Sequence, residues 1–152
     1  MTGRASMPES AQPEAASSSD LTSVQGKKIL LIDDGKAVRD VIRIFLEKEG
    51  FQVCGEAADG VEGVEQAKKL KPDLVVLDLA MPRMDGVEAA SILSRSMPTV
   101  PIVLLTMYGD AVGGLLASAS GISAVISKTD GFEKLVTCVR SLLLRSPSQQ
   151  SQ

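Results

Sequence analysis

The chain has 152 residues, a formal net charge of −3 and no histidine. This length suits one folded domain with spare residues, and the lack of histidine excludes imidazole bases, Ser-His triads and a phosphohistidine within this chain. A net negative charge without a run of Lys or Arg disfavours direct nucleic-acid binding. Because no apolar stretch is long enough for a membrane span and the N-terminus lacks the pattern of a secretory signal, we expect a cytoplasmic protein.

The two ends of the chain are polar. Residues 1–26 are rich in Ser, Ala, Pro, Glu and Gln, and residues 146–152 have the same character, so neither segment can offset the entropy of ordering. We predict a disordered N-terminal arm over 1–26, a folded domain over 27–145 and a disordered tail over 146–152. Cys54 and Cys138 form no metal motif and are expected to be buried free thiols.

Short apolar runs predict five strands, and amphipathic stretches between them predict helices. After the first strand, Val38, Val41 and Leu46 fall on one helical stripe, and Gly50 can end that helix. In chain order, the predicted strands are 29–32, 51–57, 74–77, 102–105 and 124–127.

The later helices are recognised by their start signals and their apolar positions. Asp59-Gly60 predicts a turn before the second helix, and Asp85 can cap the third helix with Glu88 three residues on, as in a capping box. A fourth helix, over about 110–120, contains Gly113-Gly114 and should be weak and mobile. The apolar positions of the other four predicted helices span 38–46, 61–70, 87–93 and 132–143.

The alternation of five strands with five helices predicts an α/β domain with a parallel sheet covered on both faces through right-handed crossovers. We choose the strand order 2-1-3-4-5. Ligands of open α/β sheets bind at the carboxyl ends of the strands, so polar residues at those ends are candidates for one shared site. These residues are Asp33 and Asp34, Asp78, Thr106 and Lys128.

Three convergent carboxylates repel one another unless a cation lies between them. Mg²⁺ is the natural candidate, because it prefers oxygen ligands and retains waters that a phosphoryl oxygen can displace. An ammonium and a hydroxyl beside such an ion would suit phosphoryl transfer. Ordinary roles stay open: Asp33 and Asp34 could be solvent-exposed, Lys128 could be an ion-pair partner only, and Thr106 could be a cap.

These residues, together with the stretch from Asp78 to Gly86, resemble the receiver domain of two-component response regulators, of the chemotaxis-regulator kind. The resemblance covers about residues 27–145 and implies a flavodoxin-like doubly wound sheet. It implies that Asp78 accepts a phosphoryl group from a histidine kinase or histidine phosphotransfer protein, and that the chain is otherwise no enzyme beyond slow autodephosphorylation. The implied Mg²⁺ ligands are Asp33, Asp34, Asp78 and the Ala80 carbonyl, and the implied phosphate ligands are Thr106 and Lys128.

Some positions depart from the family pattern. Val125 stands where the family usually has an inward-turning Tyr or Phe, and Met107 follows the threonine where a small residue is common, so Met107 is expected to fill the space. Tyr108 is either a substitute ring that shields the site or a surface aromatic. Thr129 stands where a proline is common, and we predict a trans Lys128–Thr129 peptide.

The resemblance implies a phosphorylation-activated switch. Phosphorylation is expected to shift the face formed by the 110–120 helix, the fifth strand and the last helix, and so to control a downstream protein target or a homodimer. Lys128-Thr129 is similar to receivers attached to helix-turn-helix output domains, so a further alternative is a fragment of a longer DNA-binding regulator. A degenerate docking module also stays open, whereas a flavodoxin-type binder is disfavoured because Asp33 and Asp34 would repel an unaccompanied phosphate.

Overall fold

The computed structural model describes residues 24–107 and 121–144, in which five parallel strands form one sheet of order β2-β1-β3-β4-β5. The predicted fold class and strand order are therefore confirmed. The strands are β1 (Lys28–Ile32), β2 (Gln52–Ala57), β3 (Leu74–Asp78), β4 (Ile102–Thr106) and β5 (Ala124–Ser127). The helices are α2 (Lys36–Lys48), α3 (Gly60–Leu70), α4 (Gly86–Ser96), the short 3₁₀ helix η3 (Lys128–Asp130) and α6 (Phe132–Leu144).

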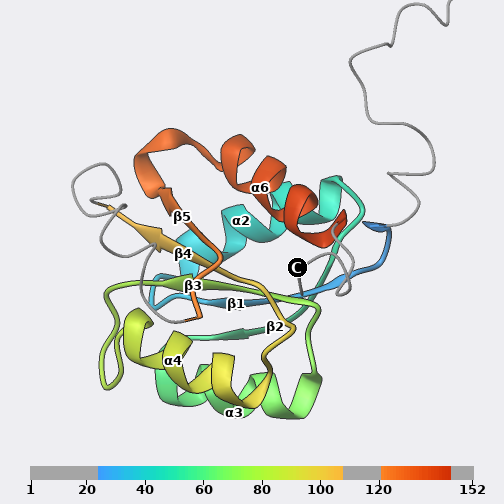
Figure 1. The fold of residues 1–152 in the computed structure, drawn as a ribbon. Coiled ribbons are helices and arrows are strands. Elements are labelled where there is room, and N and C mark those ends of the chain that lie inside the picture. Colours follow the sequence, from blue (N-terminus) through green and yellow to red (C-terminus); the bar gives the residue numbers. More distant parts are fainter. Residues whose placement is uncertain (1–23, 108–120, 145–152) are drawn as a thin grey trace, which may run out of the picture.

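Helices cover both faces of the sheet. In Figure 1, α2 and α6 lie above the sheet and α3 and α4 lie below it. Each side has its own apolar core, one formed by the sheet with α2 and α6, the other by the sheet with α3 and α4. Strands β3 and β4 are buried along their whole length. Because both faces of the central strands are covered, their sequences are continuous apolar runs rather than alternating ones.

The folded part begins before the predicted boundary at residue 27. Val24 is fully buried in the core, and the Gly26 N–H donates to the Gly50 carbonyl at 2.8 Å. The predicted helix at 110–120 lies outside the described residues, as do the rest of the predicted N-terminal arm and the predicted tail. These three remain predictions.

The predicted turn at Asp59-Gly60 is the start of α3. Asp59 Oδ1 accepts from the Glu62 N–H at 2.9 Å, and Glu62 Oε1 accepts from the Ala58 N–H at 3.0 Å. The predicted cap of α4 is confirmed, since Asp85 Oδ1 accepts from the Glu88 N–H at 2.9 Å. Both helices begin with the same Asp-Gly-Val-Glu sequence, so one capping signal explains both starts.

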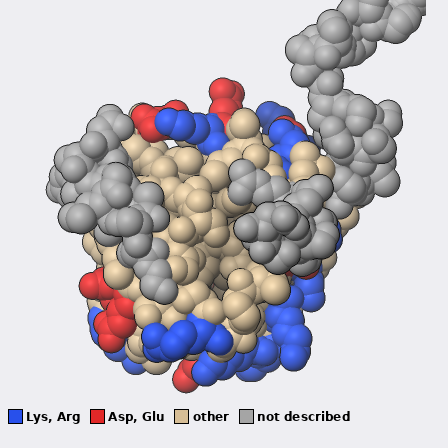
Figure 2. Space-filling model, viewed as in Figure 1, with Lys and Arg blue, Asp and Glu red and all other residues tan. Residues whose placement is uncertain are grey.

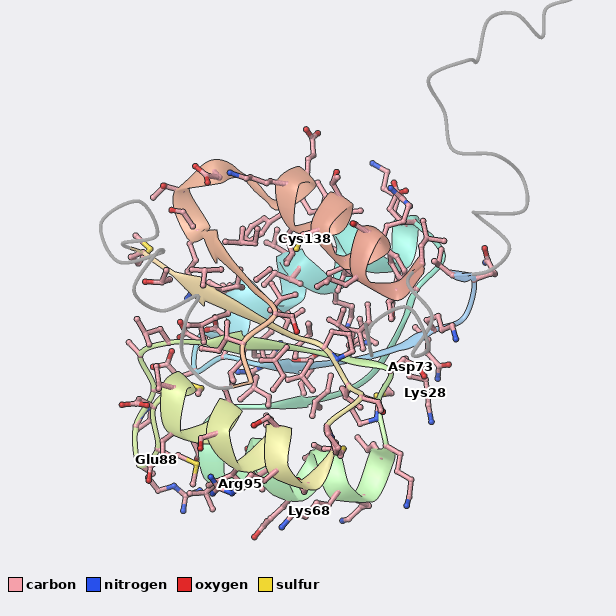
Figure 3. All side chains as sticks on the ribbon, viewed as in Figure 1. Lys28, Lys68, Asp73, Glu88, Arg95 and Cys138 are labelled. Atoms are coloured by element: carbon pink, nitrogen blue, oxygen red, sulfur yellow. The ribbon has the colours of Figure 1, made fainter. Side chains whose placement is uncertain are left out.

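Three further expectations need correction. Val41 is 38% exposed, because it lies at the solvent edge of the apolar stripe of α2. Cys54 and Cys138 form no disulfide, as expected, but they are half-buried; Figure 3 labels Cys138 on α6. The second strand begins one residue later than predicted, because the Phe51 N–H still bonds to the Leu46 carbonyl at the end of α2. Within the described residues, no helix has the length and apolar character needed to cross a membrane.

A cluster of ion pairs ties α2 to the edge strand β2. Arg39 Nε lies 2.7 Å from Glu56 Oε1, and Arg43 donates to Glu56 Oε2 through Nε at 2.9 Å and through Nη2. Burial alone would raise the pKa of Glu56, but the hydrogen bonds from Arg39 and Arg43 outweigh burial and lower it. Glu56 is therefore ionised in the folded protein at neutral pH.

Replacement of Glu56 by Gln should lower the free energy of unfolding by about 1 to 2 kcal/mol at pH 7, because two guanidinium groups lose their shared carboxylate. The folded-state pKa of Glu56 is depressed, so its contribution is present above the unfolded pKa and is lost as the pH falls through the folded pKa. Urea unfolding of both proteins from pH 7 down to pH 3 should show the difference shrinking. Glu47→Gln, at an exposed pair with Arg43, is the control and should change stability by less than about 0.5 kcal/mol. A difference that does not change with pH would contradict this account.

Candidate functional site

The predicted site residues come together at the carboxyl ends of four strands. Asp33 follows β1, Asp78 ends β3, Thr106 ends β4, and Lys128 begins η3 directly after β5. Carboxylate oxygens of Asp33, Asp34 and Asp78 lie within 4.8 Å of one another. Asp33, Asp78 and Thr106 are buried, whereas Asp34 is exposed. Parallel strands therefore bring residues up to 95 positions apart in the chain into one acid pocket.

Lys128 bridges two of the three acids. Its Nζ lies 2.9 Å from Asp33 Oδ2 and 3.1 Å from Asp78 Oδ1, and its side chain is 15% exposed. Burial alone would lower the pKa of Lys128, but contact with Asp33 and Asp78 raises it above its ordinary value. The ammonium therefore stays charged. Ser127 supports this turn, because its Oγ caps η3 by accepting from the Thr129 N–H at 3.2 Å.

The pKa of Asp78 lies above its ordinary value. Burial raises its pKa most, the charge of Asp33 raises it further, and Lys128 offsets these effects only in part. When all three acids are ionised, three negative charges face one ammonium, which leaves a charge of −2 at the site. A second cation beside Asp78 would relieve this excess, since an opposite charge close by favours the ionised form.

The donor set fits a hard divalent ion. Asp33 Oδ1 accepts from the Gly35 N–H at 2.8 Å, which orients the carboxylate. Asp33 Oδ2 is buried, and the Lys128 ammonium at 2.9 Å is its one polar partner within the described part of the chain. A buried oxygen with free lone pairs among three clustered carboxylates matches the oxygen ligands that Mg²⁺ prefers.

The loop between β3 and α4 holds the backbone of Asp78 in place. The Leu79 N–H donates to the Leu105 carbonyl at 2.8 Å, and the Gly86 N–H donates to the Leu79 carbonyl at 2.7 Å. A Cβ atom at Gly86 would lie 2.4 Å from the Asp78 carbonyl oxygen. Only glycine therefore allows α4 to begin this close to the acid pocket.

The acid pocket opens to solvent as a cavity of about 260 Å³, lined by Asp34, Asp78, Leu79, Ala80, Thr106, Met107 and Lys128. A larger hollow of about 380 Å³ lies elsewhere, and no ionisable side chain lines it among the described residues. The smaller cavity is therefore the one whose lining suits a metal ion or a phosphoryl group.

The positions that depart from the family pattern surround this cavity. Met107 is 57% exposed, so the expectation that it fills the space is wrong: the side chain lies at the rim. Val125 is half-buried and packs against the core formed by the sheet with α3 and α4. The Lys128–Thr129 peptide is trans, as predicted. Tyr108 lies outside the described residues.

Fold and site together define a receiver of two-component signalling, and comparison with known proteins agrees. Residues 29–140 match the response regulator receiver domain family, to which this chain therefore belongs. The chemotaxis protein CheY of Thermotoga maritima is 34% identical over 103 residues, which are 68% of this chain and 86% of CheY. The response regulator protein VraR of Staphylococcus epidermidis is 36% identical over 114 residues, which are 74% of this chain and 54% of VraR.

One similar solved structure was determined with Mg²⁺ and BeF bound. The response regulator protein TrrA of Thermotoga maritima, in complex with Mg²⁺-BeF, is 29% identical, has a TM-score of 0.69, and aligns over 76% of this chain and 98% of its own. This chain spans between 50% and 65% of the length of VraR and three other curated regulators that it matches.

Arg39 on α2 contacts the site, and Glu56 on β2 holds Arg39; neither was among the sequence-based candidates. Arg39 donates to the Asp33 carbonyl as well as to Glu56. A cation on the first helix, six residues past Asp33, is a weak signal, because surface arginines are common on helices. Glu56 has no signal in a single sequence, since its pairing with Arg39 depends on how α2 packs against β2.

Removal of one charge from the acid pocket should stabilise the metal-free protein. Asp78→Asn should raise the free energy of unfolding by about 1 kcal/mol in Mg²⁺-free buffer at pH 7, because a buried carboxylate that repels Asp33 is lost while Lys128 keeps Asp33 as a partner. Urea unfolding with a chelator present measures this change. Asp40→Asn, at an exposed acid paired with Lys36, should change stability by less than about 0.5 kcal/mol. Destabilisation by Asp78→Asn would show that the acid pocket is not strained by charge.

Proposed function

We propose that the protein is a phosphorylation-activated switch, in which Asp78 accepts a phosphoryl group from the phosphohistidine of a histidine kinase or histidine phosphotransfer protein. The observation that carries this proposal is the placement of Asp78 at the end of β3, within a cluster of three carboxylates and beside the Lys128 ammonium. Family membership and a relative crystallised with Mg²⁺-BeF support it.

In the proposed transfer, an Asp78 carboxylate oxygen forms a bond to phosphorus while the phosphorus–nitrogen bond of the donor breaks. The bonding electron pair leaves with the donor imidazole, and the product is an aspartyl phosphate. Lys128, now 3.1 Å from Asp78, would pair with an oxygen of the new phosphoryl group, and the Thr106 hydroxyl would donate to another. Bound Mg²⁺ would supply neutralisation of phosphoryl charge, held by Asp33, Asp34, Asp78 and the Ala80 carbonyl.

The proposed output is a population shift. A phosphoryl group adds about −1.5 to −2 charges and new acceptor oxygens, which favour a conformation that brings Thr106 toward them. The face to be shifted comprises the helix predicted at 110–120, β5 and α6. Because β5 carries Val125 at the position where the family usually has an aromatic residue, this shift would proceed without an aromatic ring at that strand position. A downstream protein or a second copy of the chain would read the changed face.

The longer relatives favour one version of this function. VraR is nearly twice as long as the matched region, and the Synechocystis relative RpaA is a DNA-binding transcriptional regulator of which this chain spans 50%. A receiver that controls a DNA-binding output domain of a longer regulator is therefore a second candidate beside a stand-alone docking switch.

In Figure 2, uncharged side chains fill the centre of the visible face and Lys and Arg lie along the lower edge, over α3 and α4. We propose a cytoplasmic location and protein partners rather than direct nucleic-acid contact by this receiver.

The central test is intact mass after incubation with a small-molecule phosphodonor and Mg²⁺. The parent protein should gain one phosphoryl group, whereas Asp78→Ala should gain none, because it lacks the accepting oxygen. Asp130→Ala, which removes an exposed acid at the end of η3, is the control and should be phosphorylated like the parent. Equal phosphorylation of the parent and Asp78→Ala would exclude Asp78 as the acceptor, and no phosphorylation of the parent would favour a docking module.

The phosphorylated protein should be long-lived for a receiver. Ala80 is exposed at the pocket and has no polar side chain that could orient an attacking water. Ala80→Asn should therefore speed loss of the phosphoryl group several-fold, as measured by the decay of phosphorylated protein in Mg²⁺ after donor removal. Tyr108→Glu is expected to act in the same direction by removing a shield. Decay that is unchanged in both variants would remove this explanation of lifetime.

A further inference from the structure

We propose that Arg39 is a positioning residue for the acid pocket: it fixes the peptide between Asp33 and Asp34 and so aims both carboxylates at the metal position. This inference rests on the proposed Mg²⁺ site. It assigns a role to a residue that lies outside the pocket lining and touches only the backbone of the pocket.

The backbone of Asp33 lies where the sheet ladder ends. The Asp33 N–H donates to the Ala57 carbonyl at 3.0 Å, which is the last bond of this kind between the β1 and β2 segments among the described residues. Beyond it, β2 turns into the start of α3, and the Ala58 N–H donates to Glu62 instead. The Asp33 carbonyl takes its hydrogen bond from the Arg39 guanidinium.

This bond matters for two acids, because the Asp33 carbonyl and the Asp34 N–H belong to one planar peptide unit. The orientation of that plane sets ψ of Asp33 and φ of Asp34, so it helps to define the backbone from which both side chains extend. The Gly35 N–H holds Asp33 Oδ1 at 2.8 Å, so a side-chain contact and a backbone contact together define how Asp33 faces Asp78. Asp34 is exposed, so the direction of its carboxylate depends more on the backbone than on side-chain contacts.

Arg39 is itself held rigidly. Its side chain is 14% exposed, and its Nε lies 2.7 Å from Glu56 Oε1, while Arg43 occupies the other oxygen of Glu56. A guanidinium can reach a carboxylate and a carbonyl at once with its fixed fork, which a single ammonium matches poorly. The chain of contacts Arg43–Glu56–Arg39–Asp33 therefore links the packing of α2 on β2 to the acid pocket.

Arg43 provides a matched control, since it binds the same carboxylate without touching Asp33. An effect of the Arg39 charge and an effect on the position of the acids predict opposite changes in Mg²⁺ affinity. If Arg39 acted only through its positive charge, Arg39→Ala would strengthen Mg²⁺ binding by removing repulsion. If it positions the acids, Arg39→Ala should weaken Mg²⁺ binding by about 10-fold, while Arg43→Ala stays within about two-fold of the parent.

Titration calorimetry with MgCl₂ on the full chain measures these affinities, and urea unfolding of each variant shows that it is folded. Arg39→Lys, which keeps the charge but not the fork, provides a second folded variant and should also weaken binding. Parent-like or tighter binding by both Arg39 variants, or an equal loss in Arg43→Ala, would overturn the inference. Failure of the parent itself to bind Mg²⁺ would instead overturn the proposed metal site.

Discussion

The structure depends on how a cluster of like charges is held together. Three carboxylates converge at one end of the sheet, and the ammonium of Lys128 lies between two of them, 2.9 Å from Asp33 and 3.1 Å from Asp78. One ammonium cannot balance three carboxylates, so the pocket favours the arrival of positive charge. Burial raises the pKa of Asp78 most, and the charge of Asp33, which belongs to this imbalance, raises it further.

The fold supplies the rigidity that such a cluster needs. Each acid follows a strand that is hydrogen-bonded on both sides and covered on both faces, so the carboxylates cannot simply move apart. Contacts with the backbone of Asp33 and Asp78 add to this rigidity. Gly86 lets α4 begin against the carbonyl of Asp78, and Arg39 holds the carbonyl of Asp33. Packing of the strands and hydrogen bonds to the backbone thus keep the three carboxylates close together despite their repulsion.

Receiver function requires that this rigid pocket be joined to a responsive part of the molecule. Thr106 ends β4 and lines the pocket, and Met107, the next residue, is exposed at its rim. On the neighbouring strand, Val125 packs against the core formed by the sheet with α3 and α4. A switch in this protein would therefore work through the position of the β4 end rather than through an aromatic ring on β5.

The amino-acid sequence by itself determined the alternation of strands and helices and the set Asp33, Asp34, Asp78, Thr106 and Lys128, because continuous apolar runs and the residues at their ends are local features that a parallel sheet brings together. The strand order was chosen rather than derived from a local pattern, and the strand pairing in the tertiary structure decided it. Only the tertiary structure decided which other residues contact or surround these five. The pairing of Arg39 with Glu56 and the exposure of Met107 depend on how elements pack, and no local pattern records this. Even Asp59 was identified as a cap only once α3 was seen to begin there, although its Asp-Gly-Val-Glu signal matched that of Asp85.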